Sequence, residues 1–492
     1  MNTFANAIKK EAAWGKTWNG ADAYTTTLNK CLDLFGRAGA MRQASVEDKK
    51  DLFMLAFDEN NDIAMKLLFY IRDIRGGYGE RDTFTDMLTW LADKHPESVE
   101  KNLWAILEYG RAKDLYALID TKSEEAMWKF MKNQFELDYA NMMAGKSCSL
   151  LAKWIATPDA SSITTAALGK KTAKKLGYDY KTMRTYKTIL RSLRKYLDIP
   201  EAKMATGKWS EIEYSKLSSQ CLIKHKAAFA RNDADRYNDF INKVNSGEEK
   251  INTGTMTPCD IMNKVISNYS SDLEAMWSNL PDYCAGNALI MCDTSGSMTW
   301  SDGCNGMLPI TVATALSIYF AERNKGPLKN MFMTFESNPH FIEVYGHTLG
   351  DKYERMLRAP WGGSTNLEAA FIRLLEVCEN NNVPKNDMPD AIVIISDMQI
   401  NCVRGISNNR IAFYDRIKEL YDEAGYKMPQ VVFWNVNAKN ATFHATADTA
   451  GVSFVSGYSP AVFKNVMDNI GKTPMELMLE IINSDRYSAI VA

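Results

Sequence analysis

Apolar residues in the first half of the chain recur at three- and four-residue steps, the spacing of amphipathic α-helices. Between residues 45 and 74 this set includes Leu52, Leu55 and Leu68. Residues at this spacing lie on one face of a helix. The pattern returns several times, separated by breaks of only a few polar or glycine-containing residues. Short breaks favour antiparallel neighbouring helices, so the pattern predicts a domain of stacked helical hairpins over residues 1–270.

From about residue 275 the pattern changes to short apolar runs that alternate with helical segments. "NALIMCDTS" (287–295) and "DAIVIISDM" (390–398) each contain a run of successive apolar residues. Such strands are buried on both faces, as in a mostly parallel sheet covered by helices on both sides. The expected fold class is therefore α + α/β, with a mostly parallel sheet and its covering helices over residues 275–492.

Composition restricts the classes of function. Apolar residues make up 46% of the chain and charged residues 24%, which is typical of a soluble globular protein. The net charge of −2 means that binding to nucleic acid must use a local patch. No apolar run is long enough to span a bilayer, and the amino terminus does not resemble a secretory signal. Nine cysteines without a CxxC pair favour a reducing, cytoplasmic location.

A sheet of this type binds its ligands beyond the carboxyl ends of its strands. Side chains with oxygen atoms follow the predicted strands at these positions. Asp293, Ser295 and Ser297 form a DxSxS run. Alternate residues of an extended turn point the same way, so the side-chain oxygens of these three residues could converge on one point. Two carboxylates with hydroxyl groups suit Mg²⁺ or Mn²⁺. The alternative is that these residues only cap the next helix. The candidate metal ligands are Asp293, Ser295, Ser297, Thr365 and Asp397.

The segments "DTSGSM", "GGSTNL" and "ISDM", in this order, resemble the metal-ion-dependent adhesion site of a von Willebrand factor A domain. The resemblance implies a Rossmann-like sheet with a metal ion on its upper rim and with some ligands acting through water. It also implies that an acidic group from a protein partner completes the coordination shell. Such a domain is a binding module, so we expect no enzymatic activity. The chain also lacks P-loop, HExxH and GxSxG motifs.

The helical half contains "RDIRGGYGER" (72–81), which resembles a signature of the TROVE/DUF2828 group, relatives of the Ro ribonucleoproteins. "YGRAKDL" (109–115), "KWSEIEYSKLSS" (208–219) and "GTMTPCDIM" (254–262) fit the same group, and its DUF2828 branch is the closer one. The resemblance implies an arch of HEAT-like helical repeats whose ends the A domain joins, with structured or single-stranded RNA bound on a basic surface. The arginines of the first segment either pair with acidic neighbours at a helix end or face phosphate.

Residues 170–195 contain ten Lys or Arg residues and one acidic residue, Asp179, with tyrosines interspersed. Cations beside aromatic rings suit single-stranded nucleic acid, because phosphates meet the charges and bases stack on the rings. A solvated helix face is the alternative. The predicted RNA-binding residues are Lys170, Lys171, Lys174, Lys175, Lys181, Arg184, Lys187, Arg191, Arg194, His225, Lys226 and Arg75.

Three functions follow from these patterns. The first is a Ro-like RNA-binding protein whose Mg²⁺-dependent A domain binds an acidic partner. The second is a protein-interaction scaffold that uses the metal site without nucleic acid, since helical repeats commonly bind proteins. The third, a metal-dependent nuclease, has the least support, because the sequence offers no dedicated general base or second-metal carboxylate cluster.

Overall fold

The computed structural model describes residues 3–284, 286–300, 307–361, 364–401, 413–438 and 440–492. In the first part of the chain the elements are α1 (Thr3–Ala12), β1 (Trp14–Lys16), β2 (Asp22–Tyr24), α2 (Lys30–Ala38), α3 (Val46–Glu59), α4 (Asn61–Arg72), α5 (Arg81–Lys94), α6 (Pro96–Lys101), α7 (Leu103–Tyr109), α8 (Glu124–Met143), α9 (Leu151–Trp154), α10 (Ile163–Lys175), α11 (Met183–Tyr196), α12 (Pro200–Ala205), α13 (Ser219–Asn232), α14 (Ala234–Ser246), α15 (Pro258–Ser267) and α16 (Ser271–Ser278). None of the described helices is long and apolar enough to cross a membrane.

The second part of the chain alternates strands and helices. Its elements are β3 (Ala288–Cys292), α17 (Pro309–Arg323), β4 (Met331–Thr334), β5 (Phe341–Glu343), α18 (Leu349–Leu357), α19 (Leu367–Asn380), β6 (Ala391–Ser396), α20 (Phe413–Glu423), β7 (Gln430–Asn435), β8 (Val452–Ser456), α21 (Ala461–Asp468) and α22 (Pro474–Ile482). The helical first part and the mixed, mostly parallel sheet of the second confirm the predicted α + α/β class.

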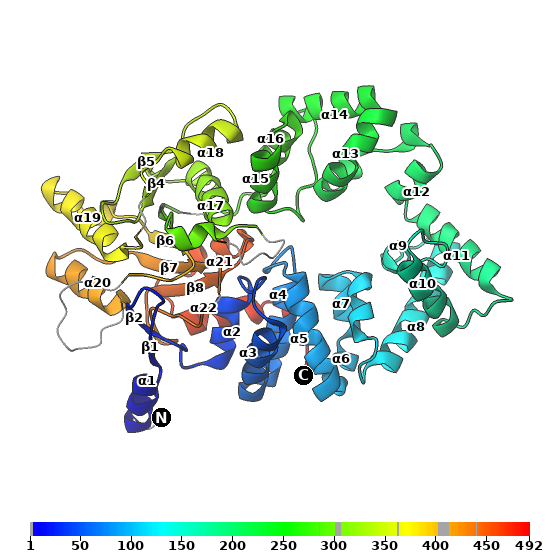
Figure 1. Cartoon of the computed structure of the whole chain (residues 1–492), viewed down its shortest axis with the longest axis horizontal. Helices are drawn as coiled ribbons and strands as arrows, with labels where there is room; N and C mark the ends of the chain where they lie inside the picture. Colours follow the sequence, from blue (N-terminus) through cyan, green and yellow to red (C-terminus); the bar gives the residue numbers. More distant parts are fainter. Residues whose placement is uncertain (1–2, 285, 301–306, 362–363, 402–412, 439) are drawn as a thin grey trace.

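The helices from α3 to α16 follow one another around an arc that begins and ends beside the sheet (Figure 1). Side-chain caps help to define where these helices begin. Ser45 accepts a hydrogen bond from the backbone N–H of Asp48 at the start of α3, and Asn60 accepts one from Ile63 at the start of α4. Each cap satisfies a backbone donor that the first turn leaves unpaired. The arc agrees with the arch that the TROVE resemblance implied.

The sheet has the strand order β5-β4-β3-β6-β7-β8, in which only β5 is antiparallel to its neighbour. This is the order of an open doubly wound sheet, which reverses direction between its two central strands. Every residue of β3, β6, β7 and β8 is buried, in agreement with their uninterrupted apolar runs. Helix α17 is buried along nearly its whole length, because it lies between the sheet and helices α15 and α18.

Both ends of the arc pack against the half of the chain that contains the sheet. At its carboxyl end, α15 packs against α17. At its amino end, α2 packs against β8, where the Gly39 N–H donates to Ser456 Oγ at 3.0 Å. A Cβ at Gly39 would lie 2.5 Å from the Ser456 carbonyl oxygen, so only glycine permits this approach. The Arg42 guanidinium lies 3.8 Å from the centre of the Tyr458 ring. The arc and the sheet therefore close into one ring of elements.

The amino-terminal residues also pack with the second half of the chain. Strands β1 and β2 pair in an antiparallel hairpin, and Tyr24 and Phe443 exchange two backbone hydrogen bonds of 2.8 and 2.9 Å. Residues 14–25, which were predicted to belong to the helical domain, therefore lie against the loop that follows β7. Strands of only three residues give too short a sequence pattern to be distinguished from a loop.

The segment "RDIRGGYGER" (72–81), which includes the end of α4 and the turn after it, is a structural junction. Arg72 pairs with Asp114 at 2.8 Å, and both side chains are buried. Gly79 has a φ of +72°, and a Cβ at Gly77 would lie 1.9 Å from the Tyr70 carbonyl oxygen. Both positions therefore require glycine. Of the two interpretations left open for this turn, the structure favours the helix end with paired charges.

Asp73 in this turn connects the helical arc to the carboxyl terminus of the chain. Its buried carboxylate forms an ion pair with Arg486 and accepts a hydrogen bond of 2.9 Å from the Tyr487 hydroxyl. The negative charge of Asp73, acting through that pair, raises the pKa of Arg486. Residues more than 400 positions apart are thereby joined at one buried charge.

Replacing Arg486 with Ala should lower the free energy of unfolding by about 2 kcal/mol. The substitution leaves the Asp73 carboxylate buried without its cation, and the estimate allows for the partial exposure of Arg486. Denaturation in urea measures the change. Arg358→Ala is the matched control, because Arg358 pairs with Glu354 on the surface and its loss should cost less than about 0.5 kcal/mol. Equal effects of the two substitutions would contradict the assignment of Asp73 as a junction.

Candidate metal centre and candidate nucleic-acid interface

The two predicted aspartate ligands follow the two central strands of the sheet. Strands β3 and β6 pair in parallel, with Cys292 opposite Ile395. The ladder continues one step further, since the Asp293 N–H donates to the Ile395 carbonyl at 3.0 Å. Asp397 lies two residues beyond Ile395 on the neighbouring strand. Both carboxylates therefore stand at the point where the strand order reverses, which is where sheets of this type bind ligands.

The Asp293 carboxylate is completely buried and is oriented by hydrogen bonds from two serines. It accepts from the Ser396 hydroxyl at 2.5 Å and from the Ser295 N–H at 2.9 Å. The Ser295 hydroxyl lies 3.1 Å from the Ser297 hydroxyl. Asp397, also buried, accepts from the Gln399 N–H at 3.1 Å. The DxSxS run therefore brings its three side chains together.

Burial and charge both disfavour the ionised form of Asp293. Desolvation is the larger effect and the negative charge of Asp397 is the second, and together they raise the pKa of Asp293 to about 7. A divalent cation between two buried carboxylates would reverse both effects, because it replaces lost hydration and neutralises the repulsion. The donor set, two carboxylates with neighbouring hydroxyl groups, fits a hard cation such as Mg²⁺ or Mn²⁺.

Thr365 is buried in the segment that precedes α19, and its backbone carbonyl accepts from the Asn401 N–H at 2.9 Å. This bond places Thr365 beside the loop that follows Asp397, on the same edge of the sheet. The amino terminus of α19 is capped by the Asn366 side chain, which accepts from the Ala369 N–H at 3.1 Å. Thr365 is therefore not the cap of this helix, contrary to the alternative considered for its sequence.

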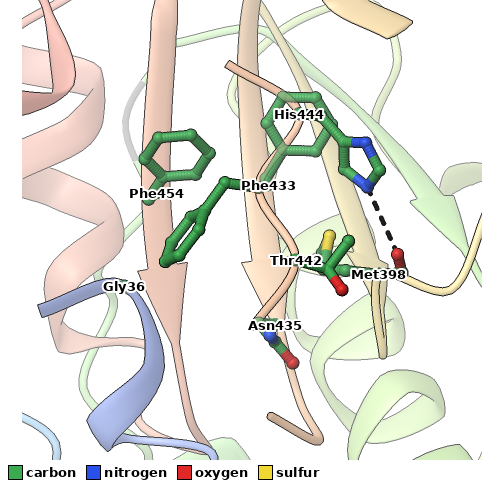
Figure 2. Close-up of a pocket in the computed structure, with 8 residues that line it drawn as sticks. Gly36, Met398, Phe433, Asn435, Thr442, His444 and Phe454 are labelled. Carbon is green, nitrogen blue, oxygen red and sulfur yellow. Dashed lines mark hydrogen bonds between the residues drawn. The ribbon is translucent and has the colours of Figure 1, made fainter. Parts of the chain in front are cut away.

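The backbone after Asp397 is held in an unusual conformation that the sequence did not reveal. Met398 has a φ of +64°, a backbone conformation that is unfavourable in free energy for residues other than glycine. His444 lies behind this residue, and its Nε2 is 3.2 Å from the Met398 carbonyl (Figure 2). Complete burial lowers the pKa of His444 to about 4, so the ring is neutral at pH 7 and its Nε2–H donates to that carbonyl. His444 thereby supports the turn that carries Asp397.

Residues near the amino terminus hold the next part of the same loop. The Thr17 hydroxyl donates to the Ile400 carbonyl at 2.6 Å, and the Trp18 N–H donates to Gln399 Oε1 at 2.7 Å. Asn19 donates to the Gln399 carbonyl at 2.5 Å. The Trp18 side chain is 84% exposed. The amino-terminal hairpin therefore fixes the loop that follows Asp397 and presents an indole ring to solvent near it.

The predicted RNA-binding residues fall into two groups on the surface. Within residues 170–195, five of them are exposed and form no ion pair in the described part of the chain: Lys170, Lys174, Lys181, Arg184 and Arg191. Lys195, which was not predicted, has the same properties. Three others pair with acidic residues: Lys171 with Glu124 at 2.9 Å, Lys175 with Glu125, and Lys187 with Asp159 at 2.5 Å. The basic excess of the segment is therefore only partly neutralised by its neighbours.

Arg194 has a structural role, which corrects its predicted role in RNA binding. Its guanidinium donates to the Ala152 and Ile155 carbonyls at 2.8 and 3.1 Å and to the Thr157 hydroxyl at 3.0 Å. These three hydrogen bonds join α11 to α9 and to the segment that follows it. Burial lowers the pKa of Arg194.

Three further predicted residues lie outside the 170–195 segment. Lys226 pairs at 2.6 Å with the buried Asp272 on α16, and His225 is half-buried on α13. Arg75 is exposed, but it lies in the turn after α4, far along the arc from α10 and α11 (Figure 1). The basic surface defined by the structure therefore consists of the exposed residues of α10, α11 and their connection.

The tyrosines of the basic segment differ in accessibility. Tyr186 is buried, and its ring centre lies 5.6 Å from that of Phe135. Tyr178 is half-buried, with its ring centre 5.3 Å from that of Tyr186. Tyr180 is 82% exposed, and the Lys181 ammonium lies 5.7 Å from the centre of its ring. Of these three rings, only that of Tyr180 could stack against a base.

Comparison with known proteins identifies the family. The model of DUF2828, a domain of unknown function, matches residues 17–143 and 131–283, which together are more than half of the chain. The chain belongs to the DUF2828 family. This confirms the DUF2828 part of the sequence resemblance. Residues 287–485 match the model of DUF7788, a second domain of unknown function, so the A-domain resemblance stays a prediction.

Two individual proteins resemble this DUF2828 chain over most of its length. The uncharacterized protein L728 of Acanthamoeba polyphaga mimivirus is 28% identical over 510 aligned positions, which cover 95% of this chain and 86% of the viral protein. The crystal structure of the Deinococcus radiodurans Ro (RSR) protein aligns with a TM-score of 0.48 and 13% identity. That alignment covers 94% of this chain and 100% of the Ro chain.

Without divalent cations, the free energy of unfolding should fall as the pH rises from about 4 to about 7. The folded protein retains a proton on Asp293 up to about pH 7, whereas the unfolded chain releases it near pH 4. Asp293→Asn should remove this part of the decline and stabilise the metal-free protein at neutral pH. Urea denaturation in EDTA across this pH range measures it. Asp387→Asn, at an exposed site, should follow the wild-type profile. A destabilised Asp293→Asn protein at neutral pH would contradict the prediction.

Proposed function

We propose that this protein binds single-stranded RNA on the exposed basic surface of α10 and α11, and that the edge of its sheet holds Mg²⁺ and an acidic residue of a protein partner. The proposal is for a binding protein and not an enzyme. Its main support is the set of exposed cations without ion pairs between residues 170 and 195, in a chain whose net charge is −2. The resemblance of its sequence motifs to the TROVE group supports RNA as the ligand.

The contacts of the basic surface favour nucleic acid over a merely solvated helix face. A solvated face in a nearly neutral protein commonly has acidic residues beside the basic ones, as Lys171 and Lys175 have on this arc. Lys170, Lys174 and Arg191 have no such partners in the described structure. The exposed ring of Tyr180 adds a surface on which one base could stack.

For the metal, the proposal adopts the von Willebrand factor A interpretation of the sheet. Asp293, Ser295, Ser297, Thr365 and Asp397 would hold the ion, some of them through water. Where a carboxylate binds through water, the divalent charge is only partly neutralised by direct ligands, and hydroxyl ligands add no negative charge. An external carboxylate is therefore a favourable additional ligand. The strand order and the adjacent burial of the two aspartates support this interpretation.

The RNA proposal predicts that reversing three charges weakens binding strongly. The triple variant Lys174→Glu, Arg184→Glu, Arg191→Glu should bind a mixed-sequence single-stranded RNA at least about tenfold more weakly. It should also lower the slope of log affinity against log salt by about 2, since each lost phosphate contact removes about 0.7. Fluorescence anisotropy over a salt series measures both quantities.

The control variant is Lys329→Glu, Lys427→Glu, Lys464→Glu. These three lysines are exposed in the half of the chain that contains the sheet, and the net charge changes by the same amount. RNA affinity should change much less in the control than in the test variant. Equal losses in both variants, or no binding by the wild-type protein, would contradict the proposal. Arg194 is unsuitable for this test, because its replacement would break contacts that hold α11 in place.

The metal proposal predicts that Mg²⁺ stabilises the protein through the two aspartates. At a concentration about 100 times its dissociation constant, Mg²⁺ should raise the free energy of unfolding by about 2.7 kcal/mol. Asp397→Asn should abolish this increase, and the exposed Asp387→Asn should keep it. Thermal denaturation with and without Mg²⁺ measures the effect. An unchanged response of Asp397→Asn would place the cation elsewhere and contradict the proposal.

A further inference from the structure

A second group of metal-binding side chains lies in the helical arc, remote in sequence from the edge of the sheet. Glu201, Cys221 and His225 each offer one ligand atom, and these three atoms all lie within 4.8 Å of one another. All three side chains are half-buried, so the site is sheltered but remains open to an ion from solvent. This geometry requires neither the sheet nor the residues of the candidate Mg²⁺ site.

The three residues come together through helix geometry. Cys221 and His225 are four positions apart on α13, which places them on the same face of that helix. Glu201 lies in the first turn of the neighbouring α12, directly after Pro200. Two ligands from one helix and a third from a second helix form a common way to build a metal site with three protein ligands.

Two of the three side chains have polar atoms that lack a partner in the described structure. Glu201 Oε2 and His225 Nε2 are both buried from solvent and form no hydrogen bond. Buried polar atoms are nearly always satisfied, so an unsatisfied carboxylate oxygen and an unsatisfied imidazole nitrogen in one ligand group favour a ligand that binds both residues. A metal cation is the simplest such ligand, because both atoms would donate lone pairs.

We propose that Glu201, Cys221 and His225 bind one Zn²⁺ ion that clamps α12 to α13. The donor set selects the metal: thiolate and imidazole ligands suit zinc, whereas Mg²⁺ and Ca²⁺ require oxygen ligands. Zn²⁺ takes ligands at about 2.0–2.3 Å, so its tetrahedral ligands lie about 3.3–3.8 Å apart. Small side-chain rotations would close the present separations to these values. Water would fill the fourth position.

The charges around the site are consistent with this ion. Burial, followed by the negative charge of Glu201, raises the pKa of the Cys221 thiol to about 11, so the thiol stays protonated when no cation is bound. Zn²⁺ would displace this proton as it binds, and the ion would then be neutralised by the thiolate and the carboxylate. Burial and the positive charge of Lys224 lower the pKa of His225, which keeps its imidazole neutral and able to bind metal.

The position of the clamp gives it a mechanical role. Helix α12 follows α11, which carries much of the basic surface, and α13 begins the part of the arc that leads back to the sheet (Figure 1). A bound Zn²⁺ would hold these two parts of the arc in one orientation. His225, which was predicted to contact RNA, would instead act on the basic surface through the shape of the arc.

Co²⁺ substitution tests the proposal directly in the full-length protein. The Asp293→Asn, Asp397→Asn double variant provides the background, because it removes the candidate Mg²⁺ site. This protein should bind one Co²⁺ per chain and show a thiolate-to-cobalt charge-transfer band, which one equivalent of Zn²⁺ should displace. Cys221→Ser should lose the band, and Glu201→Gln should keep the band but bind Co²⁺ about tenfold or more weakly. Circular dichroism checks that each variant is folded.

Cys148→Ser is the matched control. Cys148 is also a half-buried thiol of the helical arc, but its Sγ lies 3.1 Å from the Asp138 carbonyl and it belongs to no such ligand group within the described residues. This variant should retain the band unchanged. A folded background protein that gives no charge-transfer band would overturn the proposal. A band that survives Cys221→Ser, or disappears in Cys148→Ser, would overturn it as well.

Discussion

The parallel pairing of β3 with β6 is the constraint on which the candidate metal centre depends. Five consecutive residue pairs, from Ala288 opposite Ala391 to Cys292 opposite Ile395, bring the ends of both strands to one level. Asp293 and Asp397 must then meet at the buried edge, where repulsion and desolvation raise the pKa of Asp293. A divalent cation bound between the two carboxylates, as proposed, would offset both costs.

The closure of the arc gives this edge a fixed relation to the basic surface. Helix α2 packs on β8, α15 packs on α17, and the buried Asp73 joins the arc to Arg486 and Tyr487. A nucleic acid on α10 and α11 and a protein at the edge of the sheet would therefore be held by one closed framework. The proposed zinc clamp between α12 and α13 would stiffen the part of this framework that lies between the two sites.

Sequence patterns predicted the features that depend on residues close together in the sequence. They did not predict contacts that depend on how distant elements pack. The apolar runs and the residues that end them were sufficient to predict the sheet and the adjacent aspartates, because parallel strands align their ends. A run of basic residues, in contrast, does not show which side chains face solvent. Arg194 turns inward and donates to backbone carbonyls, and Lys226 on α13 pairs with Asp272 on α16. His444 forms a hydrogen bond with the Met398 carbonyl, 46 positions earlier in the chain, and no local sequence pattern predicts this contact. Cys221 and His225 have a readable helical spacing, but their third partner comes from another helix.

The most direct test of the central claim is anomalous diffraction from crystals of the wild-type protein grown with Mn²⁺. The account predicts one anomalous peak at the edge of the sheet, within bonding distance of an oxygen of Asp293 or Asp397 or of water bound to them. It also predicts that the Ser295 and Ser297 hydroxyls and Thr365 surround the peak. An ordered sheet edge that contains no manganese, with the two carboxylates sharing a proton instead, would contradict the account.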